Sequence, residues 1–145
     1  METGVTKLID DVLTELTFHG CAYHKTGSNY ICNPPVTDTD IDYVVTGGNA
    51  RMVLETAGFV AHDPKGLYEA TKSYSYRKDN YSFIVQDDSD LFKKWILATE
   101  VAKHLNLLNK GDRIVLFSAI TKGQMPKKRQ QVEVLEGIFV DAHEI

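Results

Sequence analysis

The chain has 145 residues, of which 16 are Lys or Arg and 20 are Asp or Glu, so its formal net charge is −4. A hydrophobic fraction of 43% and a charged fraction of 25% are typical of a globular protein and exclude a disordered, collagen-like or disulfide-scaffold class. This length suffices for one hydrophobic core, so we expect a single domain over residues 1–145. The net negative charge argues against nonspecific nucleic-acid binding.

The charge is unevenly distributed along the chain. Residues 1–63 contain nine acidic and three basic side chains, whereas residues 64–145 contain 11 acidic and 13 basic ones. The first part therefore carries a net charge of −6 and the second part +2. We expect an acidic half that faces a basic half in the folded chain.

The sequence also predicts where in the cell the protein is located. Cys21 and Cys32 are the only cysteines, too few for a secreted disulfide framework and compatible with a reducing cytosol. No apolar run approaches the ~20 residues of a membrane span, and the first residues lack the pattern of a signal peptide. We therefore expect a cytoplasmic protein that does not cross a membrane.

The first part of the chain predicts a helix and then a strand. Apolar residues at helical spacing predict a helix over residues 7–18, capped by Thr6 and terminated by Gly20. A short apolar strand over residues 21–23 follows and leads to Gly27-Ser28. Because prolines interrupt residues 29–39, this stretch is expected to be mostly loop.

The middle of the chain predicts further strands. Asp40–Val45 alternates at first and then becomes wholly apolar, which indicates a strand whose C-terminal half is buried on both faces. After a Gly47-Gly48 turn, Asn49 is expected to cap a short helix over residues 50–57. Aromatic residues then predict a hairpin of strands 67–76 and 80–86, with residues 77–80 as its turn.

The remainder of the chain predicts helices. Ser89 is expected to cap a helix that continues to about Leu107, a second helix spans residues 110–121, and a third follows Pro126. The fold class is therefore α+β: a small twisted mixed β-sheet with helices packed on it. Residues 20–86 are rich in strands and residues 89–145 are helical.

Two motifs, a pair of carboxylates and a Gly-Ser turn, indicate a binding site for a metal ion and a phosphate. Asp40 and Asp42 lie two residues apart on a predicted strand, so their carboxylates project from the same face. Hard divalent cations are the usual ligands of such a pair. Upstream, Gly27 permits a tight turn, and Ser28 with nearby backbone N–H groups can bind a phosphate. A phosphate site beside a two-carboxylate Mg²⁺ site is suited to phosphoryl or nucleotidyl transfer.

A simpler interpretation is that Asp38, Asp40 and Asp42 form a solvated strand face after a Pro-rich loop. An Asp-x-Asp pattern by itself does not separate the two interpretations. The Gly-Ser turn, separated from Asp40 by eleven residues and preceded by a strand, favours the functional interpretation.

The order of an apolar strand, Gly27-Ser28, and then Asp40-Ile41-Asp42-Tyr43 resembles the signature of the nucleotidyltransferase superfamily, which has the DNA polymerase beta-like fold. Residues 91–95 and 110–117 also look like small nucleotidyltransferase-like proteins carried by bacteriophages. The resemblance implies that Gly27 and Ser28 grip a nucleoside triphosphate and that Asp40 and Asp42 hold Mg²⁺, with two ions in an active enzyme. A phage-encoded protein would act in the host cytoplasm.

The chain departs from that family at a third carboxylate, which active members carry on a neighbouring strand and often use as a base. The corresponding stretch here, residues 80–86, contains no carboxylate. Either Asp79 substitutes for it, or Asn80 or Ser82 occupies the position. In the second case catalysis is slow, needs an acceptor that is already acidic, or is absent.

Two basic residues, Lys110 and Arg113, begin a predicted late helix and could contact the triphosphate. The leading hypothesis is a Mg²⁺-dependent nucleotidyltransferase that moves a nucleotide from an NTP to a protein, RNA or small molecule and releases pyrophosphate. The alternative is a catalytically inactive protein of the same fold that binds a nucleotide or a partner protein.

Overall fold

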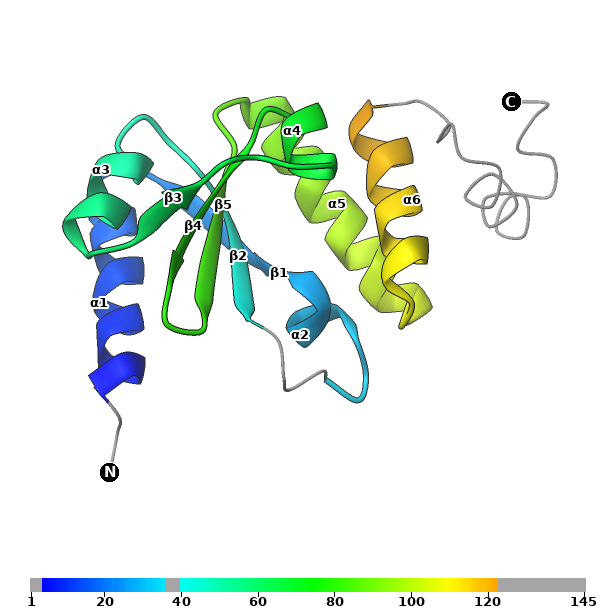
Figure 1. Cartoon of the computed structure of the whole chain (residues 1–145), viewed down its shortest axis with the longest axis horizontal. Helices are drawn as coiled ribbons and strands as arrows, with labels where there is room; N and C mark the ends of the chain where they lie inside the picture. The colour runs from blue at the N-terminus through cyan, green and yellow to red at the C-terminus, as the bar shows by residue number, and fades with distance from the viewer. Residues whose placement is uncertain (1–3, 36–39, 123–145) are drawn as a thin grey trace, which may run out of the picture.

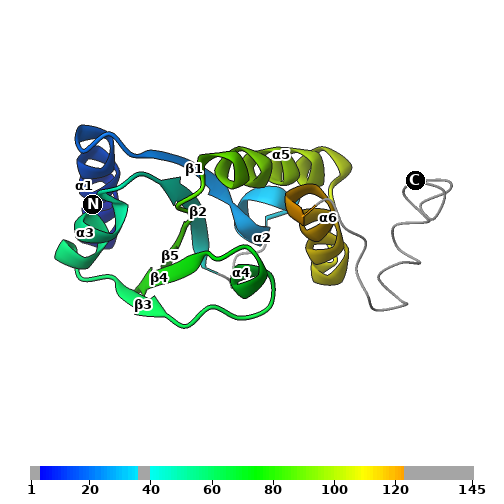
Figure 2. The ribbon, with the colours of Figure 1, turned by 90° about the horizontal axis from the view of Figure 1, so that it is seen from above.

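The computed structural model describes residues 4–35 and 40–122. Its centre is a five-stranded mixed sheet in the order β1-β2-β5-β4-β3, with helices on both faces (Figures 1 and 2). This architecture confirms the predicted α+β class. No helix among the described residues is long and apolar enough to cross a membrane.

The bounds of the elements follow the chain order. The strands are β1 (Ala22–Thr26), β2 (Ile41–Thr46), β3 (Val60–His62), β4 (Tyr74–Lys78) and β5 (Tyr81–Val85). The helices are α1 (Gly4–Phe18), α2 (Gly27–Ile31), α3 (Ala50–Thr56), α4 (Leu67–Ala70), α5 (Ser89–Leu105) and α6 (Lys110–Lys122).

The pairing of β2 with β5 is parallel, and the other strand pairs are antiparallel. Asp42 on β2 lies opposite Thr26 of β1 on one side and opposite Ser82 of β5 on the other. Ser82 in turn lies opposite Arg77 of β4. Because paired residues in neighbouring strands share a face, these four side chains form a row across the sheet.

A separate hydrophobic cluster covers each face of the sheet. Helices α1 and α3 pack on Tyr43 and Val45 of β2, together with Phe83 of β5. Helices α2, α5 and α6 pack on Val44 and Ile84 on the other face, and α4 contributes to the same cluster. Val44 and Val45 are both fully buried, so the prediction that β2 ends buried on both faces is confirmed.

Several predicted boundaries are wrong. Residues 27–31 form the short helix α2 rather than entering a loop, and the strands of the predicted hairpin are shorter, with α4 over part of its first strand. Lys78 still belongs to β4, so the turn contains only Asp79 and Asn80, and Asp79 takes a left-handed φ of 53°. The predicted helix after Pro126 lies outside the described residues.

The predicted helix caps also differ. Helix α1 begins at Gly4, so Thr6 lies inside it rather than capping it. The side chain of Asn49 makes no capping hydrogen bond to α3. At the start of α5 the cap is Asp88, whose carboxylate accepts from the backbone N–H groups of Asp90 and Leu91, and Ser89 is already helical. The carboxylate reaches both N–H groups because Asp88 keeps an extended backbone.

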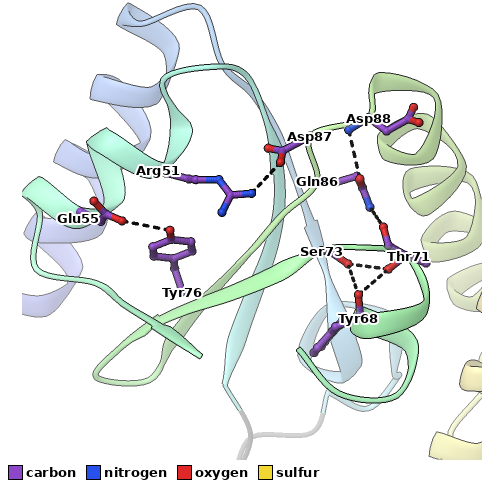
Figure 3. Close-up of polar contacts among 9 residues, drawn as sticks. All are labelled: Arg51, Glu55, Tyr68, Thr71, Ser73, Tyr76, Gln86, Asp87 and Asp88. Carbon is purple, nitrogen blue, oxygen red and sulfur yellow. Dashed lines mark hydrogen bonds and ion pairs between the residues drawn. The ribbon is translucent and has the colours of Figure 1, made fainter. Parts of the chain in front are cut away.

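Gln86 joins the end of β5 to the segment that follows α4 (Figure 3). Its side chain is buried, and it donates to the carbonyl of Thr71 over 3.0 Å while accepting from the N–H of Asp88 over 3.2 Å. The hydroxyls of Thr71 and Ser73 bond to each other at 2.6 Å and close the same turn. This network fixes α4 next to the start of α5.

Replacing Gln86 by Met tests this network. The volume is nearly kept, but the Thr71 carbonyl and the Asp88 N–H lose their partner in a buried region, so we expect a loss of about 2 kcal/mol in the free energy of unfolding. Urea denaturation of both proteins measures it. A loss below about 0.5 kcal/mol, within the range of ordinary surface substitutions, would contradict a structural role for the side chain.

Candidate functional site

A cavity of about 830 Å³ opens on the face of the sheet that α2, α4, α5 and α6 cover. All of the residues that the sequence indicated for a site line it: Gly27, Ser28, Asp40, Asp42, Lys110 and Arg113. They come from three stretches of the chain: the start of α2, the start of β2 with the residue before it, and the first turn of α6. The fold thus brings the two predicted halves of the site together.

The two carboxylates lie at the floor of the cavity. Asp42 belongs to β2 and Asp40 directly precedes it, so both project from the face that carries Val44. Burial raises the pKa of Asp42 to about 7, and the nearby Asp40 contributes in the same direction, while Arg77 lowers it. Two carboxylates this close repel each other, which a cation between them would relieve.

The turn from β1 into α2 lies directly against Asp42. Gly27 has a φ of 79°, and a Cβ atom placed there would overlap the Asp42 carboxylate. Only glycine meets both conditions, because it tolerates the left-handed region and carries no side chain. Ser28 follows as the second residue of α2 and also lines the cavity.

Basic side chains line the same cavity from the second half of the chain: Lys65, Arg77, Lys110 and Arg113. Arg113 also has a structural role, since its Nη1 donates to the carbonyls of Leu107 and Leu108 over 3.0 and 2.9 Å. It therefore ties the end of α5 to the start of α6. In the folded chain, acidic side chains from the first part of the sequence and basic side chains from the second part line the same cavity.

Ser82 is one of the three residues that the sequence offers where the resembled family carries a third carboxylate. This residue lies opposite Asp42 in the parallel pair of β2 and β5, and it lines the cavity. Its buried hydroxyl bonds to that of Ser75 at 3.0 Å, and Nε of Arg77 donates to Ser75 over 3.2 Å. Asp79 lies in the turn between β4 and β5 and is not among the lining residues.

The inner part of the cavity is apolar. Trp95 is buried and stacks on Tyr68 with ring centroids 5.9 Å apart, as expected for a core tryptophan. Its indole N–H donates to the hydroxyl of Thr26 over 3.3 Å, and that hydroxyl bonds to Thr99 at 2.7 Å. Burial raises the pKa of Tyr68 to about 12, with Asp42 adding to the shift and Arg77 opposing it.

Sequence reasoning missed Lys65, Tyr68 and Arg77 as lining residues. Arg77 was assigned to a turn, although Ser75 and Arg77 alternate with Tyr74 and Tyr76 in the manner of a strand. Extending that alternation by two residues places Arg77 on the face of Ser75. Lys65 lies in no predicted element, and Tyr68 was expected in a strand where the structure has α4.

The donor set suits one Mg²⁺ ion, which binds proteins through one or two carboxylates and takes its remaining ligands from water and substrate phosphates. Within residues 4–35 and 40–122, no three His, Cys, Asp or Glu side chains are grouped to hold a metal. Asp38, the other acidic residue of this stretch, lies outside the described residues. Asp40 and Asp42 are therefore the carboxylates available to such an ion in the described cavity.

Comparisons of the chain with protein-family models, with curated proteins and with solved structures find no match. The resemblance to nucleotidyltransferases consequently stays a prediction that rests on the residues themselves.

The raised pKa of Asp42 predicts a pH-dependent stability. An unfolded Asp titrates near pH 4, so between pH 4 and 7 the folded chain retains a proton that the unfolded chain has lost. The free energy of unfolding therefore falls as the pH rises through this window. Asp42→Asn removes that penalty, so we expect the variant to exceed the wild type by on the order of 2 kcal/mol at pH 8 and by much less at pH 4.5.

Urea denaturation at the two pH values measures both differences. An equal gain at pH 4.5 and pH 8 would show that ionisation of Asp42 is not the cause.

Gly27→Ala tests the contact between the β1–α2 turn and Asp42. The substitution imposes a strained φ and a steric overlap, so we expect a loss of about 2 kcal/mol or more in the free energy of unfolding. Gly48→Ala is the matched control, since a Cβ there meets nothing within 4 Å. Equal stabilities of the two variants in thermal unfolding would rule out the close approach.

Proposed function

We propose that this chain is a Mg²⁺-dependent nucleotidyltransferase. It binds a nucleoside triphosphate in the cavity, moves the nucleotide to an acceptor on a protein, RNA or small molecule, and releases pyrophosphate. The observation that carries the proposal is the shared cavity, in which Asp40 and Asp42 lie beside Gly27 and Ser28 and face basic side chains. We further propose that it acts in a cytoplasm, that of a bacterial host if a phage carries it.

Different residues bind the metal ion and the phosphates. Asp40 and Asp42 hold the Mg²⁺ ion, which when bound neutralises charge on the phosphates. Gly27 lets the backbone of the turn approach the ligand closely, and Ser28 contributes the first polar side chain of α2. Lys110 and Arg113 contact the triphosphate from α6, where their charges offset that of the leaving pyrophosphate.

The chemical step is an in-line displacement at the α-phosphorus. An oxygen of the acceptor forms the new P–O bond while the bond to the bridging oxygen of pyrophosphate breaks, and pyrophosphate leaves with both electrons. Since Ser82 cannot serve as a general base, an acceptor that still carries a proton must lose it to solvent. An acceptor that is already ionised, such as a phosphate or carboxylate, needs no base and is the favoured class.

A specific observation favours a second candidate, a protein of this fold that binds a nucleotide without transferring it. The position opposite Asp42 on β5 holds Ser82, whose hydroxyl is engaged with Ser75, so the site lacks a carboxylate that transfer commonly uses. Such a protein would use the same cavity for a Mg²⁺–nucleotide complex.

Two measurements separate the candidates. Calorimetry with each NTP and Mg²⁺ tests binding, and incubation with α-labelled NTP and cell lysate tests transfer. We expect both to be positive. Binding with no labelled product would support the second candidate, and no binding of any NTP would exclude both.

The double variant Asp40→Ala/Asp42→Ala tests the metal site. Loss of both metal ligands is expected to reduce labelling at least 100-fold, since metal charge stabilisation contributes several kcal/mol. Asp11→Ala is the control, because Asp11 is an exposed carboxylate on α1, which packs on the opposite face of the sheet. Labelling that survives the double substitution would exclude this pair as the metal site.

A further inference from the structure

We infer that the cavity takes one divalent cation with the nucleotide, rather than two, and that Arg77 supplies the second positive charge to the phosphates. The inference rests on the proposed function, and it assigns to this chain a charge arrangement that replaces a second metal ion by a guanidinium group.

One row of side chains crosses the sheet at the carboxylates. Two metal ions in a transferase site lie about 3.5–4 Å apart, so negatively charged ligands around both ions offset their mutual repulsion. Here Asp42 is flanked by Thr26 and Ser82, both neutral, and beyond Ser82 the next member of the row is Arg77. A cation placed over Ser82 would gain no carboxylate from β5 and would be repelled by Arg77.

Arg77 is held by a hydrogen bond to the sheet. Its Nε donates to the buried hydroxyl of Ser75 over 3.2 Å, and that hydroxyl in turn bonds to the buried hydroxyl of Ser82. Among the described residues Arg77 forms no ion pair, although other basic side chains do, such as Arg51 with Asp87. The guanidinium of Arg77 is thus held by a hydrogen bond without being taken up in an ion pair of the described residues.

Arg77 lies close enough to Asp42 and Tyr68 for its positive charge to lower the pKa of both groups. Arg77 also lines the cavity itself. A planar guanidinium presents several N–H donors that match phosphate oxygens in pairs, a geometry that a lysine does not reproduce.

The count of bound ions tests the inference without relying on turnover. The full chain is mixed with a non-hydrolysable α,β-methylene NTP, and Mn²⁺ bound to the complex is counted by electron paramagnetic resonance. We expect one Mn²⁺ per bound nucleotide. Two Mn²⁺ per nucleotide would overturn the inference while leaving the proposed function intact, whereas a chain that binds no analogue at all would overturn both.

The affinity of variants tests the role of Arg77. Arg77→Gln is expected to weaken binding of the same Mn²⁺–analogue by about 10- to 100-fold, the range for loss of a charge-assisted hydrogen-bonded pair. Arg77→Lys should fall between Arg77→Gln and the wild type, because it keeps the charge and loses the paired donors.

Arg51→Gln is the matched control. Arg51 lies on α3 and bonds to Asp87 at 2.7 Å, away from the residues that line the cavity (Figure 3). We expect its analogue affinity to equal that of the wild type. An Arg77→Gln protein that is folded by circular dichroism and binds as tightly as the Arg51→Gln protein would overturn the assignment of Arg77.

Discussion

The contact between the β1–α2 turn and the carboxylate of Asp42 is the constraint on which the site depends. Because Gly27 brings the backbone against Asp42, the carboxylate is buried, its pKa rises, and α2 begins directly beside it. A bulkier residue would push the turn away from β2 and open the floor to water. The same contact sets the local geometry for Thr26, whose hydroxyl receives the indole N–H of Trp95 and so links the turn to α5.

The cavity combines charges that the sequence keeps apart. Its carboxylates come from the first 63 residues and its basic side chains from the remainder. The sheet brings Arg77 of β4 toward Asp42 through Ser82 of β5, whereas Lys110 and Arg113 come from α6. Each group alone would be unfavourable: Asp40 and Asp42 repel each other, and so do clustered Lys and Arg side chains. A ligand that carries both signs, such as a metal-bound polyphosphate, lowers the energy of both groups at once.

The sequence predicted the two carboxylates, the Gly-Ser turn and two of the four basic side chains that line the cavity, but neither Lys65 nor Arg77. The alternation of Asp40 to Val45 revealed β2 and the shared face of the carboxylates, because period-2 burial is a local signal. It could not reveal which strand lies beside β2. Ser82 reaches Asp42 only through a parallel pairing that spans about 40 residues of chain, and nothing local encodes that register.

Strand β3 was missed because all three of its residues are exposed and show no alternation. Arg77 was misplaced because the polar run after it reads as a turn, although only Asp79 and Asn80 leave the strands.

Under the proposed function, the neutral Ser82 opposite Asp42 affects both the class of acceptor and the number of metal ions. Ser82 removes a candidate base, which favours an acceptor that is already ionised, and it removes a metal ligand, which favours a single cation. An anionic acceptor that approaches an anionic triphosphate needs positive charge from the protein, and fewer metal ions increase that need. Arg77 stands next to Ser82 in the row, and Lys65, Lys110 and Arg113 line the same cavity. The loss of a carboxylate and the presence of these basic side chains are therefore two parts of one electrostatic arrangement, since the charge that a second metal would bring is already carried by the chain.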